Sequence, residues 1–250
     1  PGGRVLGGFR NEMRTDTRVR SIDDYLASSD VFPDVGRKGG ICYFLWDRDN
    51  PGDCRITTHH QGWDDSTATR PLLMPGADVF VRFNEGLSIL QKVIEVETGQ
   101  RESLALPPEK QFMELASVRR PFGDIPRAPA MPARGKSRGT VYQAGKNGSM
   151  KRADVPSGLA MIDKWKVFVG FLAPGTGNRD TYPGMVISTP FLGAPGSVSA
   201  ETYLRIGGSD SRAEAESMGS YLACRLTRYL ILLRKPSQNT TRKVYAFVPT

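Results

Sequence analysis

Gly39-Gly40-Ile41-Cys42-Tyr43-Phe44-Leu45-Trp46 is the stretch that does most to decide the fold class of this chain. An apolar and aromatic run follows the glycine pair and ends at the turn-forming residues 47–52. A short apolar run between such turn signals is typical of a β-strand that is covered on both faces. Residues 41–46 are therefore predicted to form a buried strand near the centre of a sheet.

Helical and strand patterns alternate on either side of this run. Apolar residues recur at helical spacing over residues 6–13, and residues 19–22 resemble a short strand. Residues 55–58 and 68–74 predict a hairpin around a polar connection, and residues 77–97 carry apolar side chains on one helical face. This alternation predicts an α/β fold class.

The C-terminal half predicts short strands followed by one long helix. Residues 166–171, 184–188 and 202–206 are strand-like and are each followed by Gly or Pro. Ser211 and Glu214 have the spacing of a capping box, and apolar residues then recur every three or four positions until Pro236. The pattern therefore predicts an α+β domain in the C-terminal half.

The charge of the chain favours a polyanionic partner. The 250 residues carry a formal net charge of +8, and clustered Lys and Arg gain affinity for phosphates by releasing counterions. No run approaches the roughly 20 apolar residues of a membrane helix, and the first residues do not resemble a signal peptide. We expect a cytoplasmic protein that binds nucleic acid and no membrane.

Motifs for a complete catalytic or metal site are absent from the sequence. It contains no Gly-x-Ser-x-Gly, Walker or His-Glu-x-x-His motif. The cysteines lack Cys-x-x-Cys spacing, and His59 and His60 are adjacent instead of being at ligand spacing, so no metal site is expected.

Several segments, spread over nearly the whole chain, resemble one enzyme family in the family's own order. They are Val31-Phe32-Pro33 and residues 38–49, 70–80, 162–167, 229–235 and 238–245. Together they resemble gamma-class N6-adenine DNA methyltransferases, particularly those fused to endonucleases in type IIG restriction-modification enzymes. The resemblance implies that residues 1–75 are the C-terminal strands and helices of a methyltransferase-like catalytic sheet. It also implies that residues 76–250 are an α+β target-recognition domain that binds double-stranded DNA.

The resemblance further implies a parent enzyme that uses S-adenosylmethionine to methylate adenine in DNA. In that family a Gly-rich loop holds the cofactor and an Asn-Pro-Pro-Tyr motif holds the target amino group, and this sequence contains neither. We therefore expect a catalytically incomplete part of a longer polypeptide, with no catalytic residue and no cofactor of its own. Its expected role is to recognise the target for the rest of that polypeptide, with or without a fused endonuclease.

Phe32 is the candidate for contact with the target base. Enzymes that modify a base in a duplex swing it out of the stack, and in gamma-class enzymes an aromatic residue at the matching position stacks on the extruded adenine. The alternative is that Phe32 fills the edge of the sheet, because most phenylalanines are core residues.

Two basic groups and one polar cluster are the candidate DNA contacts. Arg and Lys suit phosphates, Asn can pair with adenine, and Arg can pair with guanine. The candidates are Lys146, Lys151, Arg152, Lys164, Lys166, Arg225, Arg228, Asn239, Thr240, Thr241, Arg242 and Lys243. Two alternatives to this assignment remain: a stand-alone nucleic-acid-binding module, and a subunit-interaction domain without an enzymatic role.

Overall fold

The computed structural model describes residues 7–34, 40–60, 62–129, 139–145, 147–173 and 185–250. The α-helices are α1 (Gly7–Thr15), α2 (Asn84–Thr98), α3 (Arg212–Ala223) and α4 (Arg225–Arg234). The strands are β1 (Val19–Tyr25), β2 (Ile41–Trp46), β3 (Cys54–His59), β4 (Ser66–Arg70), β5 (Gly139–Tyr142), β6 (Gly148–Met150), β7 (Trp165–Gly170), β8 (Phe191–Gly193), β9 (Val198–Ser199) and β10 (Tyr203–Ser209). Short 3-10 helices are η2 (Ser28–Asp30), η3 (Pro108–Lys110), η4 (Phe112–Leu115), η5 (Arg152–Asp154), η6 (Leu159–Met161) and η7 (Arg242–Tyr245). The predicted mixed α/β class is confirmed.

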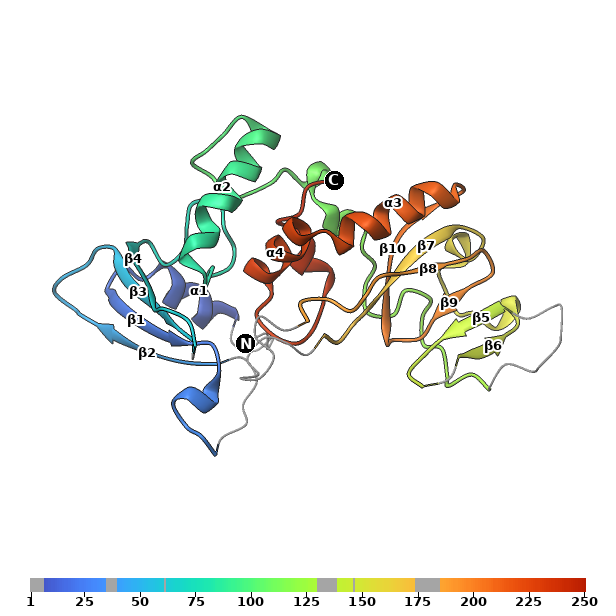
Figure 1. Ribbon diagram of the computed structural model, residues 1–250, viewed down its shortest axis with the longest axis horizontal. Coiled ribbons are helices and arrows are strands. Elements are labelled where there is room, and N and C mark those ends of the chain that lie inside the picture. The colour runs from blue at the N-terminus through green and yellow to red at the C-terminus, as the bar shows by residue number, and fades with distance from the viewer. Residues whose placement is uncertain (1–6, 35–39, 61, 130–138, 146, 174–184) are drawn as a thin grey trace.

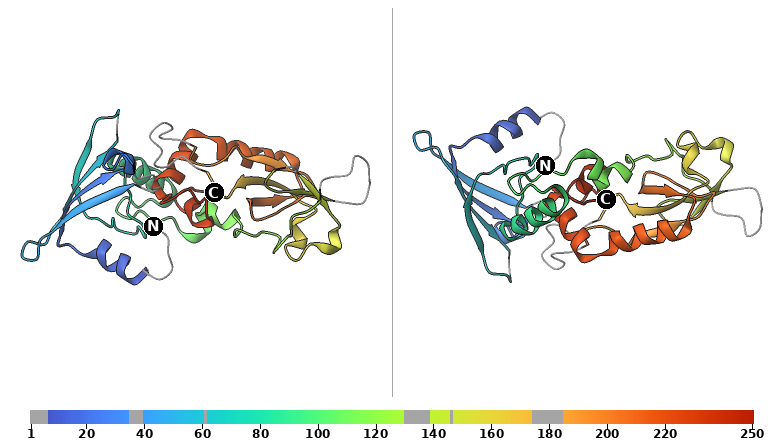
Figure 2. Two further views of the ribbon diagram at one scale, coloured as in Figure 1. Left: turned by 90° about the horizontal axis from the view of Figure 1, so that it is seen from below. Right: turned by 90° about the horizontal axis from the view of Figure 1, so that it is seen from above.

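The molecule is elongated, with a different sheet at each end. The sheet of β1 to β4 lies at one end, α4 lies near the centre, and β5 and β6 lie at the other end (Figures 1 and 2). The first sheet has the order β2-β1-β3-β4, in which β1 is parallel to β3 and the other pairs are antiparallel. The pairing of β3 with β4 confirms the predicted hairpin. The small hydrophobic core beside this four-stranded sheet consists of Val19, Cys54, Ile56 and Leu72.

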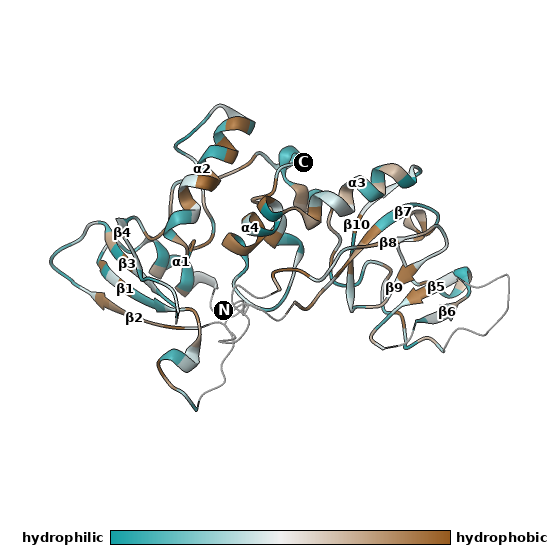
Figure 3. Cartoon of the chain, in the orientation of Figure 1, coloured by the Kyte–Doolittle hydropathy of each residue, from teal (hydrophilic) through white to brown (hydrophobic). Residues whose placement is uncertain are grey.

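The prediction that residues 41–46 form a buried central strand is wrong. β2 is a strand at the edge of its sheet, and Tyr43, Phe44, Leu45 and Trp46 are all exposed. In Figure 3 it is a largely hydrophobic ribbon at the outer margin of the molecule. An apolar run specifies a strand but not its place in a sheet, because the place depends on which other segments pair with it.

The helix predicted for residues 77–97 is shorter than expected. α2 begins at Asn84 and is followed by Gly99, which has a positive φ of 71°. Residues 77–83 are irregular, and two of them form hydrogen bonds with the first sheet. Arg82 Nε donates to Asp24 Oδ2 at 2.6 Å, and the Val81 carbonyl accepts from Arg70 Nη2 at 2.6 Å. These tertiary bonds outweigh the local helical pattern.

Two further small sheets follow in the second half of the chain. One has the order β10-β7-β8 and the other the order β6-β5-β9. The strands predicted near residues 166–171 and 202–206 are confirmed, whereas residues 185–188 form no strand and residue 184 lies outside the described residues. The largest core cluster joins β7 and β10 to α2, α3 and α4 through residues such as Val169, Ile206 and Leu230.

The helical pattern after Ser211 folds as two helices instead of one. Ser211 Oγ accepts from the Glu214 N–H at 3.4 Å, as the capping-box spacing predicts. α3 then ends because Cys224 has an extended backbone with ψ 144°, and α4 begins at Arg225. The break allows Leu222 of α3 and Leu230 of α4 to reach the same core cluster.

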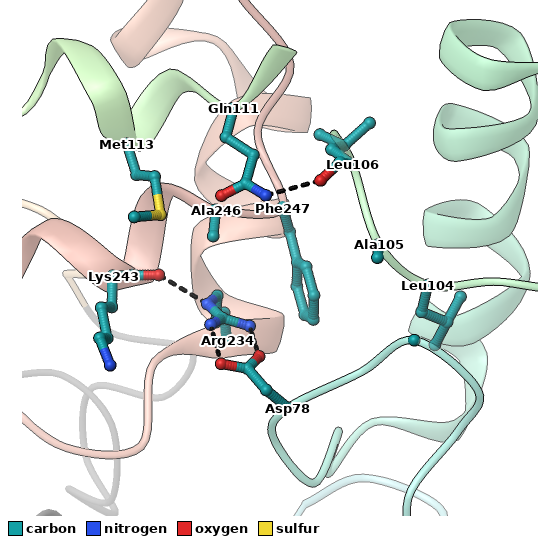
Figure 4. A pocket seen from close by; sticks show the side chains of 11 residues that line it. Asp78, Leu104, Ala105, Leu106, Gln111, Met113, Arg234, Lys243, Ala246 and Phe247 are labelled. Carbon is teal, nitrogen blue, oxygen red and sulfur yellow. Dashed lines mark hydrogen bonds and ion pairs between the residues drawn. The ribbon is translucent and has the colours of Figure 1, made fainter. Parts of the chain in front are cut away.

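α4 also ties the first part of the chain to the second. A Cβ on Gly86 of α2 would stand 2.3 Å from Leu233 Cδ2, so α2 approaches α4 closely at this glycine. The Arg234 guanidinium binds both carboxylate oxygens of Asp78, donates to the Lys243 carbonyl at 2.6 Å and lies 4.8 Å from the centre of the Phe247 ring (Figure 4). This pairing lowers the pKa of Asp78 below its ordinary value. Arg234 therefore joins three segments at one point.

Candidate nucleic-acid interface

A cleft of about 840 Å³ lies between the β3–β4 connection, the start of α2 and the first turns of α4. Leu26, Phe83 and Leu232 contribute apolar surface to it. Trp63, Arg225, Arg228 and Tyr229 contribute the cations and the large aromatic rings. Asp64 and Glu85 line it as well, and Glu85 is hydrogen-bonded to Ser66 Oγ.

Arg225 and Arg228 owe their position to the helix that carries them. They are three residues apart, so they lie on the same side of α4, whereas Leu230, Ile231 and Leu233 are buried in the core. Both arginines are exposed. Within the described residues, neither has a carboxylate within ion-pair distance, whereas Arg18, Arg119 and Arg152 are examples of exposed arginines that do. Two guanidinium groups on this cleft are therefore available for an anion.

Trp63 stands between this cleft and a smaller one of about 480 Å³. Its side chain is 62% exposed, and its ring lies edge-on to His60 with the ring centres 6.0 Å apart. Sequence reasoning did not select Trp63, although one signal was visible: a tryptophan inside the polar connection of a predicted hairpin. A large exposed aromatic ring beside free cations is an arrangement that suits a nucleotide.

Phe32 lies on the segment that borders the smaller cleft. Ser29, Asp30 and Pro33 line that cleft, and the Phe32 N–H donates to the Ser28 carbonyl at 2.8 Å. The Phe32 side chain is 51% exposed, and it belongs to none of the hydrophobic clusters formed by the described residues. Its exposure is compatible with stacking on a base, and that role remains a prediction.

Most described members of the first predicted basic group already bind other protein groups. Lys146 lies outside the described residues, and Lys151 is exposed. Arg152 pairs with Asp163 at 2.6 Å and Lys164 pairs with Asp210 at 2.5 Å, both at the surface. This segment lies toward the β5–β6 end of the molecule, away from α4 at the centre (Figure 1).

Lys166 is not a DNA contact, and its prediction as one is wrong. The residue is fully buried, and its Nζ donates to the carbonyls of Met161, Ile162 and Lys164 at 2.8, 2.8 and 2.9 Å. Burial lowers the pKa of Lys166 to about 8, so the ammonium form, whose three N–H groups match the three carbonyls, still predominates at neutral pH. Its function is to hold the turn that precedes β7.

The C-terminal polar cluster contains one further correction. Thr240 is fully buried, and its N–H donates to the Phe171 carbonyl at 2.7 Å, so it cannot reach a base. Asn239 is half-buried and forms a bridge with Leu172, whereas Thr241 and Lys243 are exposed. Arg242 donates to the Met113 carbonyl at 2.8 Å and pairs with Glu114. Lys243 and Thr241 are thus the members most open to a partner.

The connection from β10 to α3 leaves no room for a ligand beside its glycine. A helix preceded by a glycine-containing strand occurs at β10 and α3, where Gly207 has a positive φ of 64°. There β10 pairs antiparallel with β7, and a Cβ on Gly207 would stand 2.4 Å from Met218 Cε. Met218 fills the space beside this glycine.

A comparison of the chain with protein-family models and with curated proteins found no match. None of the helices within the described ranges has the length and apolar character that crossing a membrane requires. In the same part of the chain, no group of three or more His, Cys, Asp or Glu side chains is arranged to hold a metal ion.

Proposed function

We propose that this chain recognises double-stranded DNA as part of an adenine-specific methyltransferase of a restriction-modification system. Its first part would belong to a methyltransferase-like sheet, and its second part would bind the target. The observation that carries the proposal is the cleft in which Trp63 stands with two arginines that have no acidic partner among the described residues. Methyl transfer itself would require residues that this sequence does not contain.

Phosphate attraction would come from Arg225 and Arg228. A guanidinium presents a planar fork of donors that can bind two phosphate oxygens at once. Because no ion pair within the described residues has to be broken first, the free energy of phosphate binding is not reduced by the loss of an existing contact. The net charge of +8 would add a long-range attraction that weakens with salt.

Base contact would come from the aromatic residues that border the two clefts. Trp63 is exposed and lines both clefts, and Phe32 lies on the segment beside the smaller one. Flat aromatic faces can replace the neighbours that a base loses when it leaves the stack. We propose that an extruded base is held in this region, with Phe32 as its stacking partner.

The double variant Arg225→Ala/Arg228→Ala is expected to bind duplex DNA about 100-fold more weakly at low salt. The physical reason is the loss of two phosphate contacts, which should also reduce the slope of log affinity against log salt by about 2. Fluorescence anisotropy with a labelled random-sequence duplex, titrated at several salt concentrations, measures both quantities.

The matched control is Arg101→Ala/Arg212→Ala, which removes two exposed arginines that pair with Glu95 and Glu216. This control should keep the affinity within about threefold of the parent chain, because non-specific loss of surface charge has a small effect. Equal losses in the two double variants would show that net charge and not the cleft determines binding. If the unmodified chain binds DNA only weakly and log affinity does not fall linearly with log salt, the subunit-interaction alternative is supported. The exposed apolar strand β2 is the feature that favours that alternative.

Trp63→Ala is expected to weaken binding of a single-stranded oligonucleotide about tenfold without changing the salt slope. Stacking is a contact with a neutral ring, so its loss should not alter the number of released counterions. Trp63→Phe should retain most of the affinity because it keeps an aromatic face. If Trp63→Ala binds as the parent chain does, Trp63 is not a stacking surface.

A further inference from the structure

His59 stands between two carboxylates that belong to different segments. Its Nε2 lies 3.0 Å from Asp23 Oδ1 on β1, and its Nδ1 lies 2.9 Å from Asp65 Oδ2 at the end of the β3–β4 connection. The Tyr25 ring is stacked on the imidazole with centres 4.4 Å apart and planes 16° apart. Both ring nitrogens of His59 are therefore directed to acceptors, and the face of the imidazole packs against the Tyr25 ring.

This arrangement requires a protonated imidazole. A neutral histidine has one N–H and can donate to one carboxylate only, whereas ionised carboxylates can only accept. When the ring loses a proton, one of its nitrogens presents a lone pair to an anionic oxygen. Asp65 is 57% exposed and Asp23 only 18%, so the contact with Asp65 is the one that water can replace.

The groups facing His59 come from three segments. Asp23 and Tyr25 lie on β1, Tyr43 lies on β2 within 6.1 Å of the Tyr25 ring centre, and Asp65 lies on the connection. His60 and Asp30 line the same small cleft. Burial by itself lowers the pKa of His59, but the hydrogen bonds with Asp23 and Asp65 outweigh it, so that the pKa is raised. The two contacts are consequently complete below the ordinary value near 6.5 and are lost as the pH rises through the higher folded-state pKa.

The Asp65 contact lies two residues from Trp63. The turn that presents Trp63 is closed by its N–H donating to the His60 carbonyl at 3.1 Å, and His60 and Trp63 both line both clefts. The structure assigns to His59 the role of a proton-dependent clamp that holds the β3–β4 connection, and with it Trp63, against the first sheet. Protonation of His59 thereby controls the position of Trp63 in the cleft. The consequence for DNA binding rests on the proposed function.

Nuclear magnetic resonance can test the clamp without DNA. The chain has two histidines, and His60→Gln identifies which imidazole signal belongs to His59. The His59 signal should titrate above 6.5, and Asp65→Asn should lower its midpoint by about one pH unit, because an opposite charge is lost. Asp64→Asn is the matched control, since it removes the same charge from the neighbouring exposed residue and should leave the midpoint unchanged. The Trp63 indole signal, assigned with Trp63→Phe, should shift with the same midpoint as His59.

A His59 midpoint at or below 6.5, equal effects of the two loop variants, or a Trp63 signal that ignores the titration would overturn the clamp. A second measurement separates this outcome from the proposed function. Duplex affinity should fall up to about tenfold from pH 6 to pH 8 in the parent chain, and this dependence should flatten in Asp65→Asn. If no variant binds DNA at any pH while the spectra behave as expected, the proposed function fails and the clamp stands. If DNA binds but the spectra do not respond, the clamp fails and the proposed function stands.

Discussion

Replacing Arg234 with methionine should lower the free energy of unfolding by about 3 kcal/mol. The substitution keeps much of the aliphatic volume but removes the paired contact with Asp78, the donor to the Lys243 carbonyl and the cation over Phe247. The Arg234 side chain is almost fully buried, whereas the Asp78 side chain is 65% exposed and can be solvated. The loss should therefore fall mainly on the contacts with the Lys243 carbonyl and the Phe247 ring. Urea unfolding followed by circular dichroism measures the change.

Arg212→Met provides the matched control for Arg234. Arg212 pairs with Glu216 one helical turn away at the surface, and its loss should change stability by less than about 0.5 kcal/mol. The lowered pKa of Asp78 adds a pH dependence with a definite sign. Its contribution is present above the ordinary aspartate value of about 3.9 and is lost as the pH falls, so the difference between Arg234→Met and the parent should narrow below about pH 4. Equal stability of the two methionine variants would contradict the assigned role of Arg234.

Lys166→Met should also destabilise the fold by about 3 kcal/mol, while leaving the salt slope of DNA binding unchanged. The carbonyls of Met161, Ile162 and Lys164 would lose their common donor. The Ile162 carbonyl would keep its bond from the Gly196 N–H, so the desolvation penalty would fall mainly on the other two. The experiment combines urea unfolding with anisotropy measured well below the unfolding midpoint. It therefore separates a structural lysine from a phosphate contact.

Lys164→Met is the control for Lys166, because Lys164 lies two residues away and pairs with Asp210 at the surface. It should lose less than about 1 kcal/mol of stability. Should Lys166→Met keep parental stability and instead reduce the salt slope, Lys166 would be a DNA contact, and the assignment of its ammonium to the turn before β7 would be wrong.

The type of a residue alone does not predict whether a lysine or arginine is available to bind DNA. A sequence rich in Lys and Arg does not reveal which cations are occupied, and Lys166, Arg234 and Arg242 all donate to backbone carbonyls. Arg225 and Arg228 were selected as candidate phosphate contacts; both are exposed and lie three residues apart on α4, and their contact with DNA stays a prediction. Their proximity to Trp63 could not be predicted, since about 160 residues of sequence separate them and only packing brings them to one cleft.

The sequence by itself determined the α/β class, the β3–β4 hairpin, the cap at Ser211 and the excess of positive charge. Each of these depends on neighbours within a few residues or on composition, so local propensity and periodicity are sufficient. Only the tertiary structure decided that β2 is an edge strand, that the last helix breaks at Cys224 and that His59 lies between Asp23 and Asp65. These features depend on contacts between distant segments, whose free energies exceed local preferences and leave no periodic trace in the sequence.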